Sequence, residues 1–227
     1  MIGGVSRNNA GLSADRIITE ALRIIDGQGL RRLTMRRLGD ALEVEAMAVY
    51  HHFPLGKEQL FDAIVEYITD VSRPRGTDAE TDAGAEESDT EADGAAEDDR
   101  PWDERLRTWA HDYRAALLRH SGALPLFINR RPDTEAALRA LELQYAAFAE
   151  AGLEGADIVR AASALEAYVT GAVIREVRGE GLASAQSAAL DGRFGHVAHL
   201  GELTVDADQA FGDGLEALLR SLTSGTV

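Results

Sequence analysis

The stretch "LTMRRLGDALEVEAMAVYHHF", residues 33–53, has the pattern of two short helices separated by a two-residue break. The first helix has Leu38 and Leu42 on one face, and Glu43 and Val44 form the break. Two short helices joined by a tight turn and packed on a third are typical of a helix-turn-helix unit. The second helix of such a unit fits the major groove of B-form DNA, which is about 12 Å wide.

Helical patterns continue on both sides of this stretch. Upstream, apolar residues at helical spacing predict a helix that starts near Ser13 and is ended by Gly27 and Gly29. Downstream, a further helix is predicted after Pro54 and Gly56. These helices are expected to share one small apolar core with the central pair.

The rest of the chain is also predicted to be helical. Periodicity resumes at Pro101, and Asp133 is a candidate cap for the next long helix. Two later helices are expected over 155–178 and over 206–222, the second capped by Asp206. No segment alternates convincingly between apolar and polar residues, so the predicted fold class is all-α.

The charge of the chain is unevenly distributed. The net charge is −16, but residues 76–99 hold six Asp and five Glu with no Lys or Arg. Without those eleven the net charge is −5, and residues 1–57 carry +2. The helix-turn-helix pattern therefore lies in the one mildly basic part. The acidic segment is interpreted as a solvated insertion, with competition against DNA for the basic surface as the alternative.

Composition shifts divide the chain into four parts. Residues 1–12 are polar and rich in Gly and Asn, which indicates a flexible tail. Residues 13–73 form the helix-turn-helix domain. Residues 74–100 have too few apolar groups to offset the entropy of ordering, so a disordered linker is expected there. Residues 101–227 form a larger helical domain.

Several classes of protein are disfavoured by the composition. The absence of Cys excludes disulfides, thiolate metal sites and thiol nucleophiles. No G-x-S-x-G or H-E-x-x-H motif is present, so an enzyme is not expected. His196 and His199 have ligand-like spacing but lack a partner in a zinc pattern, and no metal or cofactor is predicted. No apolar run has the length of a membrane span, so we expect a cytoplasmic protein.

The N-terminal pattern resembles a known family. Residues 13–70, with "LTMRRLGDAL", "VYHHF" and "GKEQL" as the strongest pieces, resemble the DNA-binding domain of the tetracycline-repressor (TetR) family. More weakly, "WDERLRTWAHDYRAALLRH", "LELQYAAFAEAGL" and "AFGDGLEALL" resemble the ligand-binding domain of the tetracycline-repressor branch. The resemblance implies a homodimeric repressor that binds a palindromic operator and is released by a small-molecule effector.

The resemblance also implies roles for residues of the helix-turn-helix unit. The residues expected to read base edges are Arg36, Ala46, Met47, Ala48 and His51. Those expected to contact phosphates are Thr34, Tyr50, His52 and Lys57. Glu43 replaces the Gly that is usual at the turn, so we expect strain there if the turn needs a positive φ.

The C-terminal domain is expected to hold the effector and the dimer interface. Candidate pocket residues are the aromatic and polar side chains Trp109, His111, Tyr113, Phe127, Gln144, Phe148, Tyr168 and Arg175. Each aromatic residue among them is more often an ordinary core residue, since aromatic stripes on helices usually belong to the core. The homodimer is expected to form through the helices near 155–178 and 206–222. The alternative function is a helical carrier or adaptor that binds small molecules without binding DNA.

Overall fold

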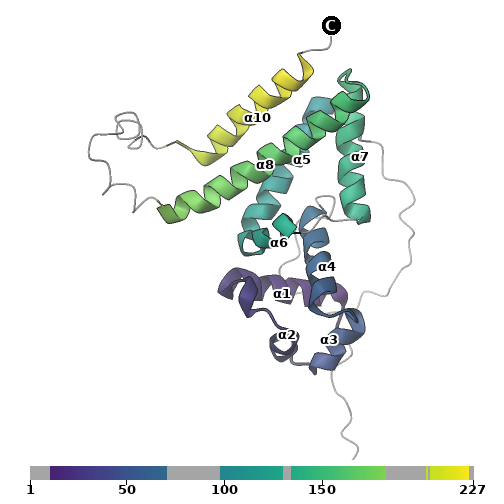
Figure 1. Ribbon diagram of the computed structural model, residues 1–227, viewed down its shortest axis with the longest axis vertical. Helices are drawn as coiled ribbons and strands as arrows, with labels where there is room; N and C mark the ends of the chain where they lie inside the picture. The colour runs from purple at the N-terminus through teal and green to yellow at the C-terminus, as the bar shows by residue number, and fades with distance from the viewer. Residues whose placement is uncertain (1–10, 71–97, 130–133, 183–202, 204, 225–227) are drawn as a thin grey trace, which may run out of the picture.

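Figure 1 shows the computed structural model of the chain, which describes residues 11–70, 98–129, 134–182, 203 and 205–224. Within these ranges all regular structure is helical, which confirms the all-α prediction. The elements are α1 (Ala14–Gln28), η1 (Leu30–Arg32), α2 (Met35–Ala41), α3 (Ala46–His52), α4 (Lys57–Thr69), α5 (Trp102–Arg119), η2 (Ser121–Ala123), α6 (Leu124–Asn129), α7 (Glu135–Glu150), α8 (Ala156–Leu182) and α10 (Ala207–Thr223).

Helices α1–α4 form the lower unit in Figure 1, and local capping sets their boundaries. Ser13 Oγ accepts a hydrogen bond from the Arg16 backbone N–H at 3.2 Å, as expected for the cap of α1. Gly29, with φ of 86°, ends that helix. The core of the unit consists of fully buried aliphatic side chains, among them Ile17, Leu22, Ile25, Leu33, Leu38, Val49, Leu60 and Ile64.

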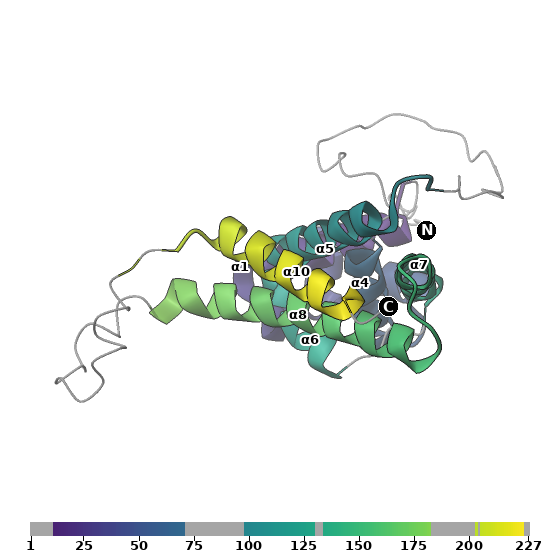
Figure 2. The ribbon, with the colours of Figure 1, turned by 90° about the horizontal axis from the view of Figure 1, so that it is seen from above.

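Helices α5, α7 and α8 pack against one another, and α10 lies beside α8. Figure 2 shows α8 and α10 running side by side, with α5 on the other side of α10 in this view. Small residues allow the close approach of these helices, since Ala110 and Ala147 are completely buried at their crossings. Larger side chains such as Leu106, Phe148 and Leu165 fill the space between them.

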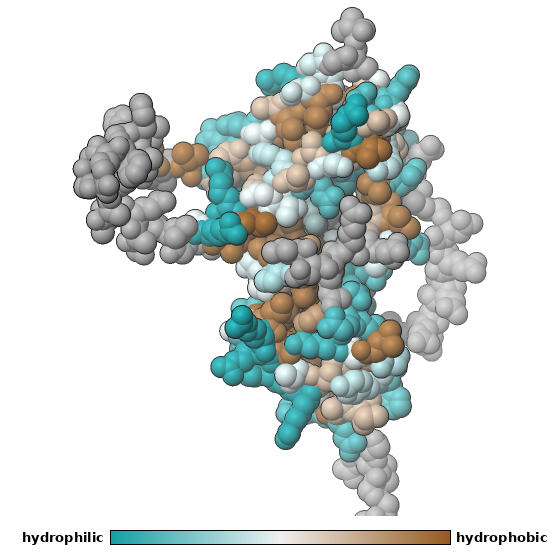
Figure 3. All heavy atoms as spheres, viewed as in Figure 1, coloured by the Kyte–Doolittle hydropathy of each residue, from teal (hydrophilic) through white to brown (hydrophobic). Residues whose placement is uncertain are grey.

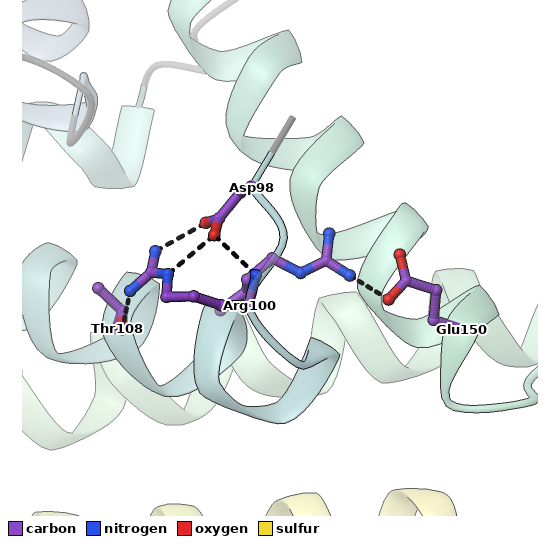
Figure 4. Close-up of polar contacts among 5 residues, drawn as sticks. Asp98, Arg100, Thr108 and Glu150 are labelled. Carbon is purple, nitrogen blue, oxygen red and sulfur yellow. Dashed lines mark hydrogen bonds and ion pairs between the residues drawn. The ribbon is translucent and has the colours of Figure 1, made fainter. Parts of the chain in front are cut away.

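Ion pairs connect the helices of this C-terminal domain. Arg107 of α5 contacts Glu216 of α10. Arg114 of α5 donates to Glu176 of α8 at 2.8 Å and to Asp208 of α10 at 2.6 Å. Figure 4 shows the start of α5, where Arg100 holds Asp98 and Thr108, and Glu150 of α7 accepts from an arginine of α5.

The two units meet where the end of α5 and η2 pack on α1. The ring Nδ1 of His120 lies 2.8 Å from Asp26 Oδ2. Next to it the backbones approach closely, because a Cβ added to Gly122 would lie 2.9 Å from the Ile25 carbonyl oxygen. This junction connects the C-terminal domain directly to the first helix of the lower unit.

Some boundaries differ from the sequence-based predictions. Helix α8 continues to Leu182, beyond the expected end at 178. Helix α7 is capped by Thr134, whose Oγ1 accepts from the Ala137 N–H, and the predicted cap Asp133 lies outside the described residues. Asp206 caps α10 as predicted.

Three regions discussed from sequence are not described by the structure. Residues 1–10 of the predicted tail and 71–97, which include nearly all of the acidic segment, lie outside the described ranges. His196 and His199 also lie outside them. Among the helices that the structure describes, none combines the length and the apolar character needed to cross a membrane.

Candidate nucleic-acid interface

The turn between α2 and α3 is tight and strained. The Val44 N–H donates to the Gly39 carbonyl at 2.9 Å. A Cβ on Gly39 would lie 3.0 Å from the Val44 carbonyl oxygen and 3.2 Å from Ala46 Cα, so glycine permits this approach of the two helices. Glu43 has φ of 57° and is the one non-glycine residue with positive φ in the described part of the chain. The turn therefore needs a left-handed residue, and the expected strain at Glu43 is confirmed.

Helix α3 is held against the unit by one face and exposes the other. Val49 is completely buried. Met47 is 62% exposed and Tyr50 is 38% exposed. The expectation that Ala48 faces outward is wrong, because it is only 9% exposed and lies next to Val49 on the packed side.

The remaining predicted base-reading positions are accessible to different degrees. Ala46, at the first turn of α3, is half-buried, and His51 is exposed. Arg36 is exposed on α2, one helix before α3. Arg36, Met47 and His51 therefore present a guanidinium, a thioether and an imidazole to solvent. These groups suit a guanine edge, a thymine methyl group and a hydrogen-bonding base edge.

The predicted phosphate-contacting residues lie around the two helices. Thr34 is the N-cap of α2, where its Oγ1 accepts from the Arg37 N–H at 3.1 Å. His52 is exposed at the last position of α3. Lys57 starts α4 and places its Nζ 4.9 Å from the centre of the Phe61 ring. Phosphate contacts are compatible with all three positions, since they need an accessible donor and not a base-specific geometry.

A close contact fixes Tyr50 at the end of α3. A Cβ on Gly56, which has φ of 73°, would lie 3.2 Å from Tyr50 Cε1. Glycine there meets two demands, a left-handed backbone and room for the ring. The entry to α4 thereby positions the aromatic end of α3.

The structure divides most of the candidate pocket residues into two groups, and Phe127 of α6 is half-buried against the core. In the first, Trp109 and Tyr113 of α5 stack with ring centres 5.1 Å apart, and both are buried. Gln144 and Phe148 of α7 are also buried, and α7 packs on α5. Burial raises the pKa of Tyr113 well above its ordinary value of 10.0, and the nearby charge of Glu166 adds to this effect.

The second group surrounds Phe211 of α10, which was not singled out from the sequence. The His111 ring meets Phe211 edge-on at 5.2 Å, and the Tyr168 ring stacks on it at 5.5 Å. The Tyr168 hydroxyl donates to the Phe211 carbonyl at 2.7 Å. Arg175 is exposed on α8. His111 and Tyr168 thus attach α10 to the domain, away from the first group.

Three buried polar atoms in the first region have no hydrogen-bond partner within the described residues. They are Trp109 Nε1 and Arg105 Nε on α5, and Gln144 Oε1 on α7. Buried polar atoms are normally satisfied, so these three atoms are candidates for contact with a bound molecule. Sequence pattern did not single out Arg105, since a buried arginine within a helical repeat is indistinguishable from a solvated one. Among the described residues, no cluster of His, Asp or Glu has the composition of a metal site.

Both parts of the chain match models of known protein families. The family model described as "Bacterial regulatory proteins, tetR family" matches residues 17–64, and "Tetracyclin repressor-like, C-terminal domain" matches residues 94–224. An HTH-type transcriptional regulator of Saccharopolyspora erythraea is 29% identical over 75% of this chain. The match spans 64% of that relative, slightly less than two thirds of its length.

Two further similarities extend over nearly the whole molecule. The class D tetracycline repressor protein of Escherichia coli is 28% identical over 93% of this chain and 89% of that protein. A possible TetR-family transcriptional regulator of Streptomyces coelicolor A3(2) has a crystal structure that superposes with a TM-score of 0.70. It is 25% identical, and the match covers 93% of this chain and 99% of that one. With its helix-turn-helix unit and helical C-terminal domain both matched, the chain belongs to the TetR family of bacterial transcription regulators.

Proposed function

We propose that this regulator is a dimeric repressor that binds a palindromic operator and releases it when a small-molecule effector enters the C-terminal domain. The observation that carries the proposal is the exposed face of α3. It offers Met47, Tyr50 and His51 to solvent while Val49 anchors the helix. A surface helix of a protein with no external partner would place few large apolar groups there.

Within this proposal the DNA contacts divide by chemistry. Arg36, Ala46, Met47 and His51 read base edges in the major groove. Thr34, Tyr50, His52 and Lys57 contact phosphates and set the register of the protein on the duplex. Ala48 is left out of the reading group because it is buried.

The proposed dimer interface consists of α8 and α10. On α8, Val159, Ser163, Ala167 and Gly171 follow one another at steps of four and are all exposed. Residues four apart share one helix face, so α8 presents a stripe of small groups. Small residues let helices approach closely, and two such helices from each subunit can form a four-helix interface.

The proposed effector site lies between α5 and α7. Support comes from the unpartnered polar atoms of Arg105, Trp109 and Gln144 beside the stacked ring of Tyr113. An effector that fits there must accept a hydrogen bond from an indole N–H and donate one to an amide oxygen. Helix α5 would carry the response to DNA, since its C-terminal end contacts α1 through His120 and Asp26.

The experiment that tests the proposal is a band-shift titration of the full chain on the DNA upstream of its own gene. We expect specific binding that Arg36→Ala weakens by about tenfold or more, the loss typical of a good base contact. Arg23→Ala is the matched control, because Arg23 is on α1 and holds Glu20 with two hydrogen bonds. Equal binding by wild type and Arg36→Ala would contradict the assignment of Arg36.

A second measurement addresses the dimer. Replacing Gly171 by Glu places a charge in the proposed interface, and we expect sedimentation to show a shift from dimer to monomer together with loss of operator binding. A wild-type chain that sediments as a monomer at all concentrations would contradict the proposal, because two half-sites require two subunits.

A further inference from the structure

The short helix η1 carries two adjacent arginines, Arg31 and Arg32, and lies between α1 and α2. Both side chains are exposed. The backbone that carries them is held in place, since the Arg32 N–H donates to the Gly29 carbonyl at 3.0 Å and Leu33 is completely buried. The two guanidinium groups therefore project from a fixed support and not from a loose loop.

The arginines of α1 already have hydrogen-bond partners. Arg16 donates to the Gly11 carbonyl at 3.3 Å, and Arg23 holds both carboxylate oxygens of Glu20 at 2.8 and 2.6 Å. In contrast, no ion pair or hydrogen bond is formed by the guanidinium groups of η1 and α2 within the described part of the chain. These arginines are Arg31, Arg32, Arg36 and Arg37.

Four guanidinium groups within seven residues, none of them with a partner among the described residues, are unexpected in a chain with a net charge of −16. Mutual repulsion disfavours such a cluster unless a polyanion is bound. The buried residues Leu33 and Met35 anchor the segment on either side of Thr34. Along the chain, Arg31 and Arg32 precede Thr34, and Arg36 and Arg37 follow it.

We propose that Arg31 and Arg32 bind phosphate groups of the DNA backbone beside the half-site that α3 reads. The inference rests on the proposed function and adds two residues outside α2 and α3 to its DNA surface. Guanidinium groups suit this role because they pair with phosphate oxygens through two parallel hydrogen bonds. Such contacts add affinity and fix the position of the protein, but they do not read sequence.

The test measures the affinity of the full chain for a random-sequence duplex of about 30 base pairs. Fluorescence anisotropy reports this affinity at a series of salt concentrations. Each phosphate contact contributes about 0.9 to the slope of log affinity against log salt. We expect Arg31→Ala and Arg32→Ala each to reduce the slope by about one per bound subunit. Arg23→Ala removes the same charge from a paired site and is expected to leave the slope unchanged.

Two further comparisons separate local contacts from other effects. Replacing both arginines with Lys is expected to restore most of the slope, because the positive charges are kept. The ratio of affinities for the upstream DNA and the random duplex is expected to stay constant in the Ala variants, unlike in Arg36→Ala.

An unchanged slope in the Arg31 and Arg32 variants would overturn the inference, as would an equal loss in Arg23→Ala. Failure of the wild-type chain to bind either duplex would instead contradict the proposed function.

Discussion

The two units of this regulator use their arginines in opposite ways. In α5, Arg105, Arg107 and Arg114 are each paired with a carboxylate on another helix. In the α1–α4 unit, Arg36 and Arg37 are exposed, and no carboxylate within the described residues contacts them. In Figure 3 the lower unit accordingly shows strongly hydrophilic residues along its lower left edge.

The two units obtain their stability from different interactions. The α1–α4 unit has an ordinary aliphatic core, and its cations are not needed to hold it together. In the C-terminal domain, α10 is attached by Phe211 and by Arg107 and Arg114, so charge contributes to its packing. Loss of Arg107 or Arg114 should therefore affect folding, whereas loss of Arg36 or Arg37 should affect DNA binding.

The greatest change in the free energy of unfolding is expected from loss of the Arg114 ion pairs. Arg114→Ala removes a buried guanidinium that joins α5, α8 and α10, and leaves Glu176 without its partner. We expect the free energy of unfolding, measured by urea denaturation, to fall by about 2–3 kcal/mol. Arg36→Ala should change it by less than about 0.5 kcal/mol while weakening DNA binding. The reverse pattern would contradict the division of roles.

The next prediction concerns the junction between the units. A Cβ at Gly122 would lie 2.9 Å from the Ile25 carbonyl oxygen and 3.1 Å from Ile25 Cγ2. We expect Gly122→Ala to lower the free energy of unfolding by about 1–2 kcal/mol and to change operator affinity, although Gly122 lies in neither of the helices proposed to contact DNA.

Gly27→Ala is the control for that junction, since Gly27 also lies next to it on α1. No atom is within 4 Å of a Cβ built there. We expect this variant to be stabilised by up to about 1 kcal/mol, as Ala replaces Gly inside a helix. Equal behaviour of the two variants would mean that close packing at Gly122 is not important.

A smaller effect is expected at the turn of the helix-turn-helix unit. Glu43→Gly should raise the free energy of unfolding by about 0.5–1 kcal/mol, because glycine adopts the observed φ of 57° without strain. Glu45→Gly removes the same side chain where φ is −67°. Thermal denaturation should show no gain for this second variant, and a gain in both would argue that charge removal is the cause.

A still smaller effect is expected for the ion pair between Arg107 and Glu216, whose contribution to stability depends on pH. The hydrogen bond from Arg107 lowers the pKa of Glu216 below its ordinary value of 4.5. A lowered pKa in the folded state stabilises the protein above pH 4.5, and this stabilisation is lost as pH falls through the folded value. Glu216→Gln should therefore be less stable than wild type at pH 7, by less than about 1 kcal/mol, and this difference should shrink as pH falls below 4.5.

A difference between these two chains that persists unchanged at pH 3 would mean that Glu216 acts by packing. The measurement is urea denaturation at both pH values, with Glu135→Gln as the control. Glu135 pairs with Arg139 within one exposed helix face, so its charge should matter little.

Much of the fold follows from local patterns in the sequence. Caps at Ser13, Thr34 and Asp206 were predictable, because a short polar side chain before an apolar repeat accepts the free N–H groups of the first turn. The break at Glu43 was visible as an interruption of two amphipathic patterns, and the strain there followed from the turn geometry.

What the sequence did not reveal depends on contacts between distant helices. Ala48 is small enough to suit either face of α3, so only packing decides that it is buried. His111 and Tyr168 belong to the same helical repeats as true core residues. Their rings nevertheless pack against Phe211 of α10. The junction of Gly122 with Ile25 joins residues almost a hundred positions apart, and no local signal marks it.

The central claim is that two copies of α3, one from each subunit, read one face of a duplex. Footprinting of the full chain on the DNA upstream of its gene tests this most directly. We predict two protected half-sites related by a two-fold axis, with centres about 34–36 Å apart or a multiple of that distance. A single protected patch without symmetry, or no protection at concentrations where the chain is a dimer, would contradict it.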